Sequence, residues 1–387
     1  IYTVTPTIAA SSAENLGLNE SLKTVQYFDG QGLPFQAVNI NFNPNGHDLA
    51  SYLEYDFWGR ETTSWMPVVG TGNNGKYIDL SYIKRMTNSY FGDTCSYSRY
   101  NYDSSPLGRL LEQYGPGQDW HNNQRSLKTF YMSNLANNDT LNCILYTIAD
   151  MGDTVLTVTH SGDYDTGELY VTKIQDEDDN TSYEFKDKLG QVVLTRQVNH
   201  NQSNNRQLLD TYYIYDDFGN LRVVLPPLAS DAKNAGTSWS SRNDDILRQY
   251  AYLYKYDHRN RCIAKKLPGC DWVLYVFDKA DQLIFSQDGE QRLKNEWAFN
   301  KYDTFGRIII SGIHETSDTH QALTDKCKDI VVKEKPGGSY GYTWLCLPEI
   351  SHLKTMTVND YEDNDHLLAQ EPRFRQLLDY FENSAYG

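Results

Sequence analysis

The sequence predicts an all-β fold in which repeated antiparallel β-hairpins form a curved or spiral sheet, with one or two short helices in insertions. Composition is the first reason, because 30 Tyr, 14 Phe and 7 Trp accompany few long stretches of helix-forming residues. The second reason is a short motif that recurs along the 387 residues: an aromatic, an Asp, two variable residues, then Gly or a substitute. Such recurrence is typical of a repeat architecture.

The clearest copies of the motif lie between Thr211 and Gly312. Their fifth position is Gly, Asn or Asp, which are the residue types that tolerate a left-handed backbone and close a bulged hairpin turn. The Asp is expected to cap that turn with its own side chain, while the aromatic and the following aliphatic residue face each other across the two strands. The predicted turn residues are Asp29, Gly32, Asp56, Gly59, Asp187, Gly190, Asp216, Gly219, Asp257, Asn260, Asp278, Asp281, Asp303 and Gly306.

In chain order, residues 1–22 are expected to form a lead-in strand and loop, and residues 23–312 the repeat region. Two insertions interrupt the repeats, near 61–101 and 228–250. Each is predicted to hold a short helix, from Ile78 to Tyr90 with Asp79 at its start, and from Asn243 to Ala251 with Ser241 as N-cap.

Between these insertions, residues 129–198 alternate apolar and polar side chains, as strands do. The less regular extension, residues 313–387, is expected to contain strands near 340–344 and 354–358 and a helix near 372–386. No closing repeat is evident there, so we expect the parent protein to continue beyond this chain.

Charge and composition exclude several classes of protein. A formal charge of −16 and a pI near 5.0 argue against a nucleic-acid-binding surface. No apolar run approaches the roughly 18 residues that span a bilayer, and a processed or trimmed N-terminus fits the opening Ile1. Six Cys without a CxxC pair argue against a zinc ribbon. Cys262 and Cys270 could meet across strands, although free thiols are favoured.

Catalytic and metal-binding motifs are weak. The repeat Asp residues recur at one structural position, whereas a catalytic carboxylate pair would be unique, so turn capping is the favoured interpretation. The acidic loop after Asp176 resembles a calcium loop only at its start, since Thr181 stands where Gly is required. His314, Glu315 and His320 lack the HExxH spacing of a zinc site, and the Gly-rich loop 70–75 lacks the Lys of a phosphate loop. We therefore expect no enzyme activity, cofactor or metal.

Several longer stretches resemble the YD-repeat, or Rhs-repeat, proteins, specifically the large surface or secreted forms of Bacteroidetes. The similarity is carried by the stretch from Tyr215 to Pro227, the stretch from Tyr254 to Gly269, and Tyr27 to Pro34 with Tyr114 to Gly117. It covers roughly residues 23–312, with the motifs in the family's order.

The resemblance implies a β-strand spiral that, in complete family members, builds a shell around a C-terminal effector, often a toxin. It also implies an autoproteolytic core with an Asp-Pro-rich motif, but this chain contains no Asp-Pro dipeptide. The chain is therefore expected to be an extracellular or cell-surface shell segment, whose partner is the missing C-terminal part of the same polypeptide.

The alternative is a cell-surface carbohydrate-binding or adhesion module, because exposed aromatics can stack on sugar rings and glycan binding is proposed for the family. Core packing across hairpins is the favoured role for any single aromatic residue. The candidates for glycan contact lie in or beside turns and loops: Trp58, Trp65, Trp120 and Trp239.

Overall fold

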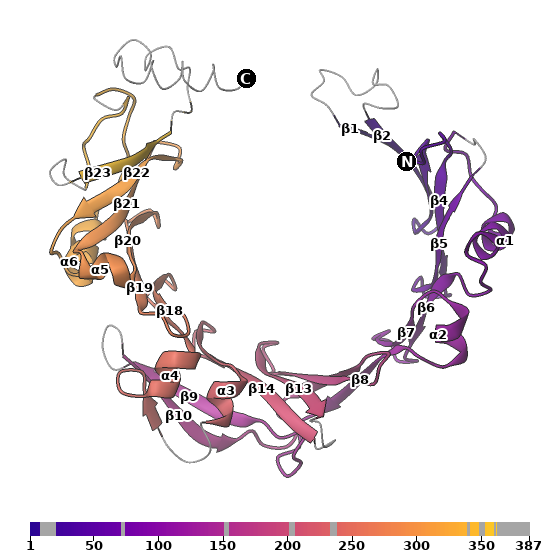
Figure 1. Ribbon diagram of the computed structural model, residues 1–387, viewed down its shortest axis with the longest axis horizontal. Helices are drawn as coiled ribbons and strands as arrows, with labels where there is room; N and C mark the ends of the chain where they lie inside the picture. Colours follow the sequence, from indigo (N-terminus) through magenta and orange to yellow (C-terminus); the bar gives the residue numbers. More distant parts are fainter. Residues whose placement is uncertain are drawn as a thin grey trace. The chain divides into compact units, whose positions relative to one another are not determined.

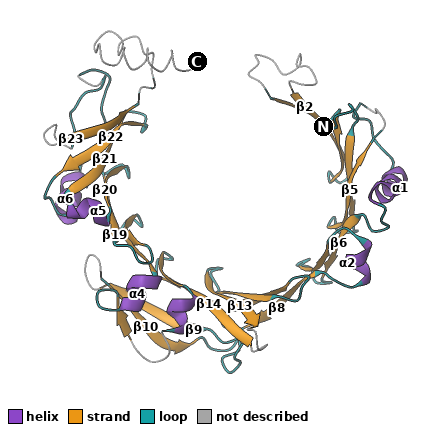
Figure 2. Cartoon of the chain, viewed as in Figure 1, coloured by secondary structure: helices purple, strands orange, loops and turns teal. Residues whose placement is uncertain are grey.

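A computed structural model of the chain describes residues 1–7, 21–70, 74–150, 155–200, 206–232, 238–338, 341–347, 353–359 and 361. The chain divides into two compact units, and antiparallel strands make up most of the regular secondary structure of each (Figure 2). Unit 1 comprises Ile1–Asn142 and Asp165–Leu209, and unit 2 comprises Cys143–Tyr164 and Asp210–Gly387. The predicted all-β, antiparallel fold is confirmed, whereas the predicted divisions at residues 22 and 312 stay predictions.

Unit 1 is an antiparallel sheet whose neighbouring strands follow the chain, except that β8 pairs with β11 (Figure 1). Its strands are β1 (Tyr2–Pro6), β2 (Ser21–Phe28), β3 (Pro34–Ile40), β4 (Leu49–Tyr55), β5 (Glu61–Val69), β6 (Tyr97–Tyr102), β7 (Leu110–Tyr114), β8 (Leu127–Ser133), β11 (Tyr170–Gln175), β12 (Thr181–Lys186) and β13 (Val192–His200).

Unit 2 has the same construction, with a small second sheet in which β10 pairs with both β9 and β16. The main sheet contains β14 (Arg206–Tyr215), whose first four residues belong to unit 1, and then β15 (Leu221–Leu225), β17 (Tyr252–Tyr256), β18 (Cys262–Lys266), β19 (Trp272–Phe277), β20 (Leu283–Gln287), β21 (Glu296–Tyr302), β22 (Ile308–Glu315) and β23 (Leu353–Val358). The small sheet contains β9 (Ile144–Asp150), β10 (Leu156–Asp163) and β16 (Ser238–Ser240).

The described residues contain six helices, where the sequence predicts one or two. They are α1 (Leu80–Phe91), α2 (Gln118–Asn122), α3 (Pro227–Asp231), α4 (Asp245–Tyr250), α5 (Gly289–Leu293) and α6 (His320–Cys327). Four were missed because three of them have only five residues and the fourth, α6, is mostly polar, so their apolar periodicity is short. The predicted helix near 372–386 lies outside the described residues.

Helix α1 forms where the sequence predicts it. Asp79 is its N-cap and accepts a hydrogen bond from the Ser81 N–H, and Gly92 ends the helix with a φ of 64°. The buried Ile83 anchors α1 in a core cluster with Val38 and Ala50, which are partners across β3 and β4. The helix therefore covers part of the sheet of unit 1 (Figure 1).

Two local predictions are wrong. The N-cap of α4 is Asp244, whose side chain accepts from the Leu247 N–H, and not Ser241. Ser241 is buried and accepts the Leu156 N–H at 2.9 Å, so it serves the small sheet instead. The predicted strand near 340–344 is absent among its described residues, which make only an isolated bridge from Tyr342 to Pro336.

A fully buried ion pair fastens the extension that follows β22. Lys301 on β21 lies 2.7 Å from Glu334, and both side chains are 0% exposed. The Lys301 ammonium also donates to the carbonyl oxygen of Cys346 at 2.6 Å and lies over the Trp344 ring. Burial lowers the pKa of Lys301, against the opposing effect of Glu334. Two buried charges are stable here because each is hydrogen-bonded by the other and by nearby groups of the extension.

We expect Lys301→Met to destabilise unit 2 by about 3–5 kcal/mol, because Glu334 would keep an uncompensated buried charge. Adding Glu334→Gln should recover part of that loss, since glutamine keeps an acceptor without the charge. Urea unfolding followed by tryptophan fluorescence measures both. A Lys301→Met variant as stable as the wild type would show that the pair does not hold the extension.

Candidate functional site

The repeat turns share one hydrogen-bond pattern, which the first of them shows. The Asp29 N–H donates to the carbonyl oxygen of Leu33 at 2.9 Å, and the Gly32 N–H donates to that of Asp29 at 3.2 Å. The Oδ1 atom of Asp29 accepts from the N–H groups of Gln31 and Leu33 at 2.8 and 2.9 Å. Gly32 has a φ of 84°, so a left-handed residue closes a bulged hairpin. The Asp thus caps the turn that it begins.

The other predicted turn residues occupy equivalent places. Each starting Asp from Asp56 to Asp303 accepts, at Oδ1, the N–H groups two and four residues ahead. The fourth turn residue is left-handed in every copy, with φ values of 77° at Gly59, 82° at Gly190, 81° at Gly219, 59° at Asn260, 63° at Asp281 and 83° at Gly306. These residues are therefore brought together in turns and not in a catalytic centre.

Two further copies of the turn were missed in the sequence. One begins at Asn43 and is closed by Gly46, and the other begins at Asp176 and is closed by Asp179, whose φ is 66°. Asp176 follows Gln175 where most recognised copies have an aromatic. In the other copy the aromatic is present as Phe42, but Asn43 replaces the Asp. A search for Asp or Asn followed three residues later by Gly, Asn or Asp would have found both.

The second carboxylate oxygen of the starting Asp is a further anchor. At four turns it accepts the Nε–H of an arginine that directly follows the left-handed residue. One of these is a longer turn, which begins at Asp103 and is closed by Gly108 with a φ of 56°. The bonds are Arg60 to Asp56 at 2.7 Å, Arg109 to Asp103 at 2.8 Å, Arg261 to Asp257 at 2.7 Å and Arg307 to Asp303 at 2.5 Å. These charge-assisted bonds lock each turn upon itself.

The same polar residues join neighbouring turns within a unit. In unit 1, Arg60 Nη1 donates to the carbonyl oxygen of Asp103 at 3.1 Å. In unit 2, Arg261 Nη1 donates to the carbonyl oxygen of Asp278 at 3.0 Å, and Asn220 Nδ2 donates to Asn260 Oδ1 at 3.1 Å. Successive turns therefore line one edge of the sheet in each unit, which we call the turn edge.

Apolar side chains project from the tips of several turns. The residue before the left-handed position is Trp58, Leu189, Phe218 or Phe305 in four copies, and these side chains are 74–83% exposed. Phe57 beside Trp58 is 89% exposed and packs edge-on against it, with 6.0 Å between ring centroids. The tips contribute nothing to the hairpin core, so they are free to contact another molecule.

The four tryptophans proposed as glycan contacts differ in exposure. Trp65 is buried on β5, where its Nε1 donates to Glu54 at 2.7 Å, so its assignment as a glycan contact is wrong. Alternation along β5 turns it inward. Trp239 is partly buried on β16 near Tyr146, while Trp120 on α2 is 38% exposed. Glycan contact stays a prediction for Trp58, Trp120 and Trp239.

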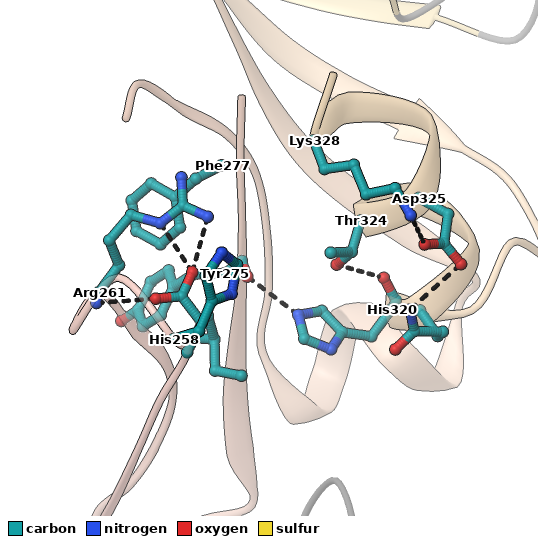
Figure 3. Close-up of a pocket in the computed structure, with 11 residues that line it drawn as sticks. His258, Arg261, Tyr275, Phe277, His320, Thr324, Asp325 and Lys328 are labelled. Carbon is teal, nitrogen blue, oxygen red and sulfur yellow. Dashed lines mark hydrogen bonds and ion pairs between the residues drawn. The ribbon is translucent and has the colours of Figure 1, made fainter. Parts of the chain in front are cut away.

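A pocket of about 300 Å³ lies in unit 2 between strands β18 and β19 and helix α6 (Figure 3). Tyr275 and Phe277 line its strand side. Its charged side chains are paired, Arg261 with Asp257 at 2.6 Å and Lys328 with Asp325 at 2.8 Å.

The pocket's remaining polar groups are also committed to structure. His320 Nε2 lies 2.9 Å from the carbonyl oxygen of Tyr275 and must carry the proton, because a carbonyl only accepts. The Thr324 hydroxyl donates to the carbonyl oxygen of His320 at 2.8 Å, and not to a base. The lining thus holds no activated nucleophile.

The part of the chain that the structure describes contains no group of three or more His, Cys, Asp or Glu placed to hold a metal ion. No described helix is long and apolar enough to cross a membrane. None of the six cysteines, all of which are described, forms a disulfide. Burial, with a smaller effect of Asp278, raises the pKa of Cys327 to about 12.

The chain is similar to a family model and to a curated protein over part of its length. Residues 2–133 match DUF6443, a domain of unknown function. Over 129 residues the chain is 25% identical to salivary gland surface protein 1 of Aedes aegypti, covering 30% of this chain and 4% of that protein.

Two solved structures share the fold at 13% sequence identity. Each match covers 90% of this chain and 16% of the chain in the solved structure. They are the crystal structure of TcdB2-TccC3, with a TM-score of 0.51, and that of TcdB2-TccC3 without its hypervariable C-terminal region, with a TM-score of 0.50. The likeness shows the fold, an array of antiparallel strands. The chain spans less than a fifth of the length of the proteins that it matches.

We expect Gly32→Ala to destabilise the first hairpin by roughly 1–2 kcal/mol, because its φ of 84° places an added Cβ in the left-handed region. Nothing lies within 4 Å of that Cβ, so the cost is that of the backbone alone. Gly30→Ala in the same turn is the matched control, since its added Cβ also meets nothing and its φ is not positive. Urea midpoints that shift equally for both would contradict the assignment of Gly32.

A hydrogen bond from the Arg109 side chain holds the pKa of Asp103 below its usual range. Burial acts to raise this pKa, while hydrogen bonds from Ser105 and from the Arg109 N–H lower it further. Because the folded pKa is the lower one, this stabilisation is complete above the ordinary Asp pKa of about 3.9 and is lost as the pH falls below it. Asp103→Asn should therefore show a smaller drop in urea midpoint than the wild type between pH 7 and pH ~2.5. Parallel pH profiles of the two proteins would contradict this.

Proposed function

We propose that this chain is a structural, non-enzymatic β-repeat segment of a secreted or cell-surface Rhs-like protein. In the full-length protein it would form part of a shell that encloses or presents a C-terminal effector, such as a toxin. The proposal rests on the structural role of the repeat carboxylates. They cap turns and tie neighbouring turns together, as Asp56, Arg60 and Asp103 do in unit 1.

The effects on pKa also favour a structural role. Hydrogen bonds within the turns lower the pKa of Asp56, Asp257 and Asp303 in spite of partial burial, which acts to raise it. A general acid at neutral pH needs the opposite shift. The repeat carboxylates are therefore suited to permanent ion pairs and hydrogen bonds.

The matched proteins support a role within a larger molecule. This chain accounts for 16% of the matched TcdB2-TccC3 chain, and one of those structures is described as lacking a hypervariable C-terminal region. The curated relative is named a surface protein, which agrees with an extracellular location. The sequence resemblance points further, to the Bacteroidetes-type surface and secreted forms.

Protease protection tests the shell proposal. In the full-length protein, the region that follows this chain should be cleaved by trypsin at least ten times more slowly than the same region expressed alone. Denaturing the shell with urea below the unfolding midpoint of the isolated region should abolish the difference. Equal cleavage rates in the native full-length protein and in the isolated region would contradict enclosure.

A further inference from the structure

A short segment of unit 2, residues 330–334, lies against the turn edge and is called the strap here. The Lys279 N–H donates to the carbonyl oxygen of Ile330 at 2.8 Å. Two residues later, the Val332 N–H donates to Oδ2 of Asp278 at 2.9 Å. The turn from Asp278 therefore binds the main chain of the strap at two points, through a carboxylate oxygen and an adjacent N–H.

The strap continues to the next turn of the same edge. The Glu334 N–H donates to the carbonyl oxygen of Tyr302, which directly precedes the turn from Asp303, at 2.8 Å. Burial alternates along the strap, with Val332 and Glu334 inward and Val331 and Lys333 exposed, as in an extended chain. Two adjacent turns thus hold one extended peptide by its backbone.

The residue after the left-handed position decides whether a turn can bind in this way. Where it is arginine, as at Arg307, its Nε–H occupies the second oxygen of the Asp. In the turn from Asp278 it is Gln282, and the second oxygen accepts the strap instead. A turn that lacks the arginine therefore offers this oxygen to an incoming N–H group, unless an asparagine at the same position occupies it, as Asn180 does in the turn from Asp176.

Unit 1 contains an equivalent pair of turns, 29–33 and 56–60. Leu33 stands at the deciding position, and no residue that the structure describes donates to the second oxygen of Asp29 or accepts from the Gly30 N–H. Both groups belong to exposed residues.

The two turns of this pair are also linked to each other in the same way as the two turns that bind the strap. Tyr55 Oη donates to the carbonyl oxygen of Pro34 at 2.7 Å, as Tyr302 Oη donates to that of Leu283 at 2.8 Å. In both pairs the second turn is the one that an arginine locks, by Arg60 in unit 1.

We propose that turns 29–33 and 56–60 form a docking site for an extended segment of another polypeptide. The site would bind the main chain of this segment with the hydrogen bonds that hold the strap. The Gly30 N–H would donate to a carbonyl oxygen, Asp29 would accept the N–H two residues later, and the carbonyl oxygen of Tyr55 would accept the N–H two residues after that. Phe57 and Trp58 stand exposed beside this path and favour apolar side chains. The unpaired carboxylate oxygen, on a protein with a charge of −16, favours a basic partner segment.

A synthetic peptide with the sequence of residues 328–334, blocked at both ends and fluorescently labelled, is the probe. Anisotropy titration into the whole chain should show saturable binding. Asp29→Asn should weaken binding about tenfold or more, because the amide replaces a charged acceptor. Gly30→Pro should weaken it as well, by removing the donor. Both variants should keep the turn, since Asn43 and Pro44 occupy the same two positions of a native copy.

Asp176→Asn is the matched control, because that turn has the same geometry but its second oxygen already accepts Asn180 Nδ2 at 2.9 Å. It should leave the affinity unchanged, and a peptide N-methylated at the position of Val332 should bind more weakly than the probe. Wild-type affinity in both Asp29→Asn and Gly30→Pro would overturn the proposal. The absence of saturable binding up to millimolar peptide, or binding lost only in Asp278→Asn, would overturn it too.

Discussion

A left-handed residue three positions after an Asp fixes where the recognised hairpins of both units reverse. Among non-glycine residues, only Asn and Asp adopt that conformation readily. The turn therefore forms where Gly, Asn or Asp stands. Because of the extra residue of the bulge, the aromatic before the Asp pairs with the second residue after the left-handed position. Tyr215 pairs in this way with Leu221, and Tyr302 with Ile308. Because a slip of one residue would invert both faces of a strand, this turn determines which side chains of the sheet are buried.

The residue that follows the left-handed position adds a second level of control. An arginine there commits both carboxylate oxygens to the turn and leaves its other nitrogens to bind the next one, as Arg60 and Arg261 do. Where Gln282 stands there, the second oxygen of Asp278 accepts an N–H group from a different part of the chain. The variable positions of the motif thus separate turns that only build the sheet from turns that can also bind.

The hairpins could be predicted from the sequence because their information is local. An Asp and a left-handed residue within four positions, and a cap such as Asp79 at the start of α1, specify structure without distant partners. The features that were missed depend on contacts between distant residues. Ser241 caps no helix because it bonds Leu156, 85 residues away, and Trp65 is hidden by neighbouring strands and its bond to Glu54. No pattern within a short window contains those partners.

The extension after β22 shows how a segment without the repeat is still held in place. Glu334 accepts hydrogen bonds from the Leu345 and Cys346 N–H groups and from the Thr343 hydroxyl, besides the ammonium of Lys301. A buried carboxylate is costly unless such donors surround it, so these bonds and the segment's path determine each other. Residues 330–334 therefore need no strand partner, because the buried charge of Glu334 holds one end and the turn edge binds the residues before it. In this way turns that reverse the strands also bind a segment that lies outside the repeat.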